Sequence, residues 1–201
     1  MARRNDHSRD ELRAMVLKAG RDIVTEEGIQ KLTTRAIAKR IGYSVGTIYV
    51  LFKDVDELKF ALNAGTLAEF RSRLSDALAP VTDPEQRLHS MAQFYLEFGL
   101  ANTSLWRLMF EHQLPGDDPM PEEITKETDK LLLIAGDALR EIVPALEENE
   151  LNHLAAAIWA SLHGIAHLVI TNKLSLANVD SGQAVLDTQM RVFIAGLEKL
   201  H

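Results

Sequence analysis

The sequence contains no cysteine and is poor in glycine and proline. Without cysteine, the chain can form no disulfide, no Cys-ligated zinc finger and no thiol nucleophile. The 11 Gly and 6 Pro among 201 residues fall below the average usage of about 12%, which disfavours collagen, disorder and a turn-rich all-β fold. A hydrophobic content of 46% and a charged content of 25% are ordinary for a globular protein. The length suits one domain or two small ones.

Long apolar segments are also scarce. Polar residues follow the first basic residues of the chain, so we expect no signal peptide. The most apolar stretch, 151–170, is interrupted by Asn, Ser, Gly and His, whereas a membrane-spanning helix needs about 20 predominantly apolar residues. We therefore expect a buried helix there, no membrane partner and a cytoplasmic location.

Charge is distributed unevenly along the chain. Residues 1–53, called the head below, contain eleven Lys and Arg against six Asp and Glu, a net charge of +5. The whole chain carries −7, so the remaining residues carry −12. A basic head on an acidic body suggests that only the head meets a polyanion. A chance fluctuation of surface charge explains the asymmetry equally well.

Apolar residues recur at helical spacing through most of the chain. Ser8 and Glu11 have the spacing of a capping box, and Gly28 is well placed to end the helix that they begin. Two short helices are expected after Thr33 and after Ser44. Longer helices are expected at about 54–79, 84–101, 105–112, 122–142, 149–173 and 182–199. The pattern predicts an all-α chain of about nine helices.

The two short helices meet at Gly42 and form a helix-turn-helix candidate. In such a motif the second helix enters the major groove of DNA and the first crosses the backbone. Gly42 suits the turn because glycine adopts a positive φ without steric cost. The motif alone is a weak signal, since an ordinary α-hairpin has similar small turn residues.

Several side chains of this motif have the chemistry to contact DNA. Ser44 would cap the second helix and leave its free amides facing a phosphate. The hydroxyls of Thr47 and Tyr49 can reach phosphates or base edges. Arg35 can reach a phosphate or a guanine, and Lys53 can neutralise a phosphate. The candidate DNA-binding residues are Thr34, Arg35, Tyr43, Ser44, Val45, Gly46, Thr47, Tyr49 and Lys53.

This part of the chain resembles the TetR/AcrR family of transcriptional regulators. The matching residues are Gly28, the run from Thr33 to Ala38, Gly42, the run from Ser44 to Tyr49, Phe52 and Leu58. The resemblance covers about 14–62, and residue types and spacing agree at many positions at once. A weaker likeness lies further on, where Trp159, His163 and Gly164 are similar to one subgroup of TetR-type ligand-binding domains.

The resemblance implies a homodimeric regulator that binds double-stranded DNA, with a helix-turn-helix DNA-binding domain at 1–54 and an effector-binding and dimerisation domain at 55–201. The implied function is that of a repressor that binds a palindromic operator and leaves it when a small-molecule effector binds. These residues do not distinguish a repressor from an activator. The last two long helices would form the dimer interface. The implied interface residues are Trp159, His163, His167, Val192 and Phe193.

The effector candidates are aromatic and apolar residues of the middle helices. Ligand sites are mostly apolar with a few polar groups, although ordinary core packing accounts for the same residues. The candidates are Phe70, Phe94, Tyr95, Phe98, Trp106, Met109, Phe110 and His112. A cationic effector bound by the acidic residues of 117–127 is a minor alternative.

The sequence departs from the family pattern at two places. Val55 stands where the family often has a phosphate-binding Lys, so Lys53 or Lys59 would have to replace that contact. Val50 and Leu51 stand where the family often has aromatic or polar residues. These apolar side chains cannot hydrogen-bond to a base edge, but they can touch a thymine methyl group.

Catalytic and metal-binding interpretations have little support. His163 and His167 have an i, i+4 spacing that can hold a metal, but packing is the simpler interpretation, and neither a metal nor a cofactor is expected. No nucleophile elbow, P-loop, dinucleotide-binding loop or zinc-protease motif occurs, so we expect no enzyme. The alternative is a helical enzyme or carrier with a purely structural N-terminal hairpin. It predicts no salt-dependent binding to duplex DNA.

Overall fold

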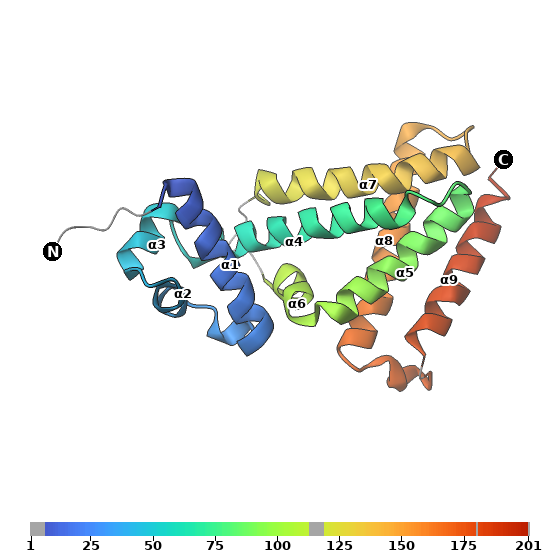
Figure 1. Ribbon diagram of the computed structural model, residues 1–201. Coiled ribbons are helices and arrows are strands. Elements are labelled where there is room, and N and C mark those ends of the chain that lie inside the picture. The colour runs from blue at the N-terminus through green and yellow to red at the C-terminus, as the bar shows by residue number, and fades with distance from the viewer. Residues whose placement is uncertain (1–6, 113–118, 180, 201) are drawn as a thin grey trace. The chain divides into compact units, whose positions relative to one another are not determined.

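The computed structural model describes residues 7–112, 119–179 and 181–200. Within these ranges the chain forms nine α-helices and two short 3₁₀ helices, with no β-strand, and the predicted all-α class is confirmed (Figure 1). Residues 113–118, between the helices expected at 105–112 and 122–142, lie outside the described residues, as does Asp180 before the last helix.

The described part of the head contains three α-helices whose ends follow local sequence signals. They are α1 (Arg9–Glu27), α2 (Thr34–Ile41) and α3 (Val45–Leu51), with the 3₁₀ helix η1 (Ile29–Lys31) after α1. Ser8 and Glu11 form the predicted capping box at the start of α1. Gly28 ends α1 with a φ of 91°, a backbone conformation that favours glycine because it has no Cβ. The helical spacing of apolar residues did not predict the short helix η1.

Six longer helices follow the head, close to the predicted ranges. They are α4 (Val55–Leu78), α5 (Pro84–Ala101), α6 (Thr103–Glu111), α7 (Glu122–Ile142), α8 (Glu148–Ile170) and α9 (Gly182–Leu197). Helix α8 ends earlier than predicted because Asn172 has a φ of 56° and turns the chain out of the helix. The segment between the helices expected at 149–173 and 182–199 contains a further 3₁₀ helix, η2 (Leu174–Ala177).

The chain divides into two compact units. The first comprises 1–67 and 104–124, and the second comprises 68–103 and 125–201. Helix α4 therefore contributes its first half to one unit and its second half to the other. The units are defined by packing alone, so the functional boundary near residue 54 stays a prediction.

The first unit is built on one apolar cluster that all three helices of the head share. Ile23 from α1, Ile37 from α2 and Ile48 from α3 are each about 1% exposed. Leu58 of α4 and Leu108 of α6 join the same cluster. Because every helix contributes at least one fully buried side chain, the cluster fixes how α2 and α3 are rotated about their own axes.

The second unit packs α8 and α9 against α5 and against each other. Helix α8 is long and apolar enough to span a membrane, by length and composition only. The residues of α8 that are buried inside the unit are Leu151, Ala155, Ile158, Leu162, Ile165 and Ala166. The expectation of a buried helix is thus correct for one side of α8. The opposite side is exposed, and Trp159 and Leu168, which flank the buried side, are exposed as well.

Truncation inside the shared cluster should destabilise the protein strongly. We expect Ile23→Ala to lower the free energy of unfolding by about 2–5 kcal/mol, because the buried side chain leaves a cavity that the neighbours fill only in part. Urea unfolding at one fixed protein concentration measures this. Leu176→Ala is the control: its side chain is 83% exposed, so a change within about 0.5 kcal/mol is expected. Equal losses in the two variants would contradict the assignment of the core.

Candidate functional site

The turn between α2 and α3 has the geometry of a helix-turn-helix motif. Gly42 ends α2 in the left-handed region, with a φ of 74° and a ψ of 26°, where a side chain would be strained. The Tyr43 amide donates to the Ala38 carbonyl at 3.0 Å and closes the turn. Ser44 then caps α3, because its Oγ accepts a hydrogen bond from the Thr47 amide at 3.2 Å. The predicted positive-φ turn at Gly42 and the predicted cap at Ser44 are confirmed.

Helix α3 buries one face and exposes the other. Ile48 and Leu51 are 1% and 7% exposed and lie in the shared cluster, whereas Tyr49 and Val50 are 52% and 68% exposed. Since Leu51 belongs to the core, the idea that it touches a thymine methyl is wrong. The two hydroxyls of Ser44 and Thr47 lie 3.0 Å apart near the exposed N-terminus of the helix.

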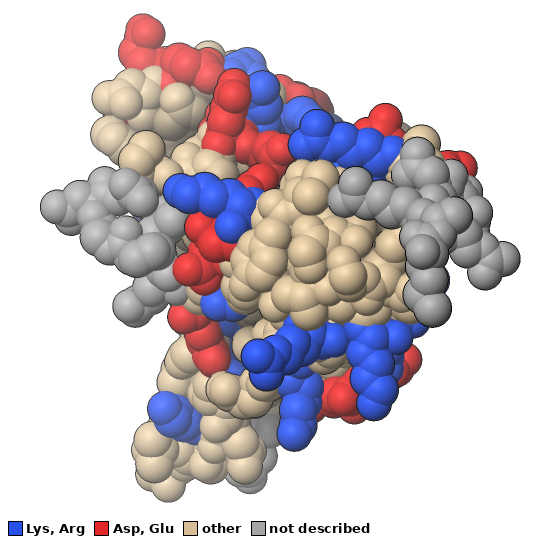
Figure 2. All heavy atoms as spheres, turned by 90° about the vertical axis from the view of Figure 1, so that its left-hand side faces the viewer, with Lys and Arg blue, Asp and Glu red and all other residues tan. Residues whose placement is uncertain are grey.

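Two of the candidate cations are exposed beside this face. Arg35 at the start of α2 and Lys53 just after α3 are both exposed, and in the described part of the chain neither forms an ion pair. Lys59, by contrast, binds the Asp56 carboxylate at 2.9 Å. Of the two lysines considered for the missing phosphate contact, Lys53 therefore has the more available side chain. Figure 2 faces the end that carries α2 and α3 and shows an uncharged area bordered by Lys and Arg.

Tyr43 has a partner that sequence reasoning missed. A hydrogen bond of 2.7 Å joins its hydroxyl to Nδ1 of His7, and the two rings meet edge to face at 6.1 Å. The contact links the residue just before the Ser8 cap with the turn of the motif. Tyr43 is half-buried, so its predicted contact with DNA would have to compete with His7.

Four of the eight effector candidates gather in the second unit. The ring of Phe70 lies edge to face against Phe94, Tyr95 and Phe98, with centroids 5.2, 5.8 and 5.0 Å away. The Tyr95 hydroxyl hydrogen-bonds Nδ1 of His163 at 3.0 Å. Burial lowers the pKa of His163 below its ordinary value, and the neighbouring His167 adds to the effect.

The other four candidates lie on α6 in the first unit, so the structure does not bring all eight into one unit. They are Trp106, Met109, Phe110 and, just after the helix, His112. His112 donates from Nε2 to the Asp56 carboxylate at 2.8 Å, and its ring lies 4.7 Å from that of Phe60. Lys59 first, and His112 second, hold the pKa of Asp56 below its ordinary value.

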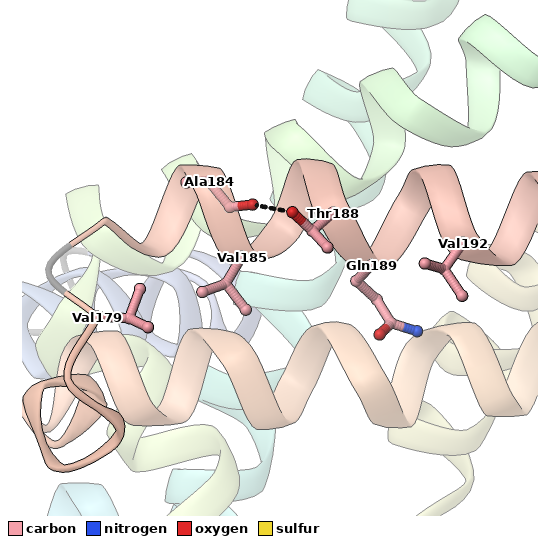
Figure 3. A pocket seen from close by; sticks show the side chains of 6 residues that line it. All are labelled: Val179, Ala184, Val185, Thr188, Gln189 and Val192. Atoms are coloured by element: carbon pink, nitrogen blue, oxygen red, sulfur yellow. Dashed lines mark hydrogen bonds between the residues drawn. The ribbon is translucent and has the colours of Figure 1, made fainter.

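The candidate dimer residues lie on neighbouring helices, and two of them are exposed. Trp159 on α8 is 43% exposed and Val192 on α9 is 64% exposed, while His163, His167 and Phe193 are half-buried. A hollow of about 390 Å³ lies along this part of α9, and Figure 3 shows the side chains that line it. The residues that line it are Val179, Ala184, Val185, Thr188, Gln189 and Val192.

The two halves of the chain match two parts of one family. Residues 16–62 match the domain described as "Bacterial regulatory proteins, tetR family". Residues 88–193, more than half of the chain, match the "Tetracyclin repressor-like, C-terminal domain". The chain belongs to the TetR family. It thus has the fold of a TetR-family DNA-binding regulator, and regulators of this family bind DNA and small molecules, typically as dimers.

Two curated relatives of this TetR-family chain differ in role. The nucleoid occlusion factor SlmA of Pasteurella multocida is 26% identical over 47% of this chain and 48% of its own length. The transcriptional activator FasR of Mycolicibacterium smegmatis is 26% identical over 63% of this chain and 58% of its own length. The matched segments therefore span only about half the length of these relatives.

Solved structures support the TetR-family fold along nearly the whole chain. A Rhodococcus sp. RHA1 protein of unknown function has a TM-score of 0.78 at 21% identity, with 98% of this chain and 100% of that chain covered. A TetR regulator of Streptomyces coelicolor has a TM-score of 0.70 at 16% identity, covering 94% and 98%. The regulator FadR of Bacillus subtilis, in complex with stearoyl-CoA, has a TM-score of 0.70 at 15% identity, covering 91% and 98%.

The Asp56 contacts should make stability depend on pH at the acid end. A carboxyl whose folded pKa is depressed stabilises the fold above its unfolded pKa and loses that contribution as pH falls through the folded value. We expect Asp56→Asn to lose stability relative to the wild type above about pH 4, and the difference to shrink in more acidic solution. Thermal melts from pH 2.5 to 7 measure this. A difference that stays constant with pH would contradict an ionised Asp56 as the cause.

Proposed function

We propose that this chain is a DNA-binding transcriptional regulator that lays the exposed face of α3 in the major groove of an operator. The observation that carries the proposal is that α3 is anchored on one side and exposed on the other. Its buried side is fixed by Ile48 and Leu51, and its N-terminus is capped by Ser44. Its outer side exposes Tyr49 and Val50. A rigid helix with a capped end and a free outer face is what groove reading requires.

The charged residues around α3 supply the contacts that hold the head on the duplex. Arg35 and Lys53 are exposed on either side of α3 in the sequence and form no ion pair in the described chain. We assign Lys53 the phosphate contact that Val55 cannot make. Thr34, Arg35, Tyr43, Ser44, Val45, Gly46, Thr47, Tyr49 and Lys53 remain the proposed DNA-binding set, within a DNA-binding domain at 1–54.

The proposed active form is a homodimer joined through α8 and α9 of domain 55–201. Trp159 and Val192 expose large apolar side chains on these two adjacent helices. The exposed residues of α8 include four small ones, which let a partner helix approach closely. These are Ala156, Ala157, Ala160 and Gly164. A two-fold dimer would place two copies of α3 on a palindromic operator.

The proposed effector is a small, largely apolar molecule, and its binding releases the operator. The aromatic residues around Phe70 and the hydroxyl of Tyr95 provide apolar contacts with a polar group beside them. The stearoyl-CoA complex of the FadR neighbour supports an effector with an apolar part. We propose a repressor without enzymatic activity that acts on DNA in the cytoplasm. The activator FasR among the relatives favours activation as the second candidate.

Selection of duplex DNA from a random pool by the purified, ligand-free protein tests the function. We expect an inverted repeat to be enriched, with half-sites about one or more helical turns apart. The logarithm of affinity should fall linearly with the logarithm of salt concentration, because bound phosphates release counterions. A folded protein that binds no duplex, or binds without salt dependence, would instead favour the helical enzyme or carrier.

The proposed contacts of the head are tested by the double variant Arg35→Ala with Tyr49→Ala. We expect operator affinity to fall at least about tenfold, since a lost base or phosphate contact costs on the order of 1–3 kcal/mol. Both side chains are exposed, so the melting temperature should hardly change. Fluorescence anisotropy with a labelled operator measures the affinity. Arg107→Ala, which removes an exposed cation of α6, is the control and should bind as the wild type does.

A further inference from the structure

Val50 is the one apolar side chain of α3 that the described fold does not use. Ile48 and Leu51 are buried in the shared cluster, and Val45 packs against that cluster from its edge. Val50 is 68% exposed and belongs to no apolar cluster among the described residues. Its place on the helix is therefore not explained by packing within the head.

The face of α3 around Val50 is open to close approach. Gly46 lies one turn before Val50, so the two positions share a face of the helix. Gly46 is exposed, and a Cβ placed on it would meet no atom nearer than the Ser44 hydroxyl at 3.6 Å. Because Gly46 has no side chain, its position adds no group that would hold an approaching surface away from Val50.

The chemistry of a valine limits what it can recognise in a major groove. It has neither donor nor acceptor, so it cannot read the polar edges of guanine, cytosine or adenine. The 5-methyl group of thymine is the apolar feature that a base pair presents there. Polar neighbours such as Tyr49 and Arg35 can contact phosphates or polar base edges, but neither contact reads a methyl group.

We propose that Val50 is a specificity-determining residue that reads the 5-methyl group of one thymine in each operator half-site. This inference rests on the proposed function, because it assumes that α3 enters the major groove. It adds the chemical group that is read and the side chain that reads it. Val45 and Leu51 are the other apolar side chains of α3 that could make such a contact. Leu51 is excluded because it is buried in the core, and Val45 is partly buried against the same cluster, so Val50 is the most exposed of the three.

Replacement of single thymines by deoxyuridine tests the proposal without altering the protein. The exchange removes only the 5-methyl group and leaves base pairing and the O4 acceptor in place. With the selected operator, we expect one thymine per half-site at which deoxyuridine weakens wild-type binding about fourfold, the worth of one buried methyl group. Substitution in both half-sites should weaken binding about fifteenfold, because the two losses add in free energy.

The same duplexes with protein variants show which side chain carries the effect. Val50→Ala should bind the thymine and deoxyuridine operators nearly alike at the sensitive position, and Val50→Thr, which keeps one methyl group, should fall between it and the wild type. Leu133→Ala removes a similarly exposed apolar side chain, 59% exposed on α7, and should retain the full penalty. Circular dichroism melts check that all variants are folded.

The outcomes separate this inference from the proposed function. An operator that tolerates deoxyuridine at every position, or a penalty that persists unchanged in Val50→Ala, overturns the role of Val50 while the regulator stands. Loss of the dimer in Val50→Ala also overturns it, because the side chain would then serve a protein contact. Failure to enrich any operator contradicts the proposed function itself.

Discussion

The burial of Ile48 and Leu51 beneath α3 is the constraint on which the rest of the head depends. A seven-residue helix is too short to be stable alone in water, so its existence relies on tertiary packing. The two side chains that anchor it also decide which residues point outward, because a rotation about the helix axis would pull them from the core. The same burial that stabilises α3 therefore selects Tyr49 and Val50 as its outer surface.

Hydrogen bonds at the helix ends set where α2 and α3 begin. Thr33 and Ser44 each accept a hydrogen bond from an amide three residues later, at 3.1 and 3.2 Å. Gly42 breaks the path between them in a conformation that other residues rarely adopt. These features involve residues only three or four positions apart. They therefore end one helix and begin the next at defined positions without contacts from distant parts of the sequence.

The distance in sequence between interacting residues decides which contacts could be predicted. The caps at Ser8, Thr33 and Ser44 were predictable because residue type and short spacing determine them. The bond between His7 and Tyr43 and the bond between His112 and Asp56 were not, because their partners lie 36 and 56 residues apart. Spacing alone likewise could not show that Leu51 is buried and Val50 exposed. The effector candidates were chosen for aromatic character, which does not reveal the unit to which a residue belongs.

Helix α4 has a consequence for cooperativity. Its early residues, such as Leu58, are buried in the cluster of the first unit, and its later residues, such as Leu74, are buried in the second. The backbone hydrogen bonds of one unbroken helix thus run through both units. Helical order propagates along such a ladder more easily than it starts anew. A loss of packing in either unit should therefore fray a helix that the other unit needs, so that the two units share part of their stability.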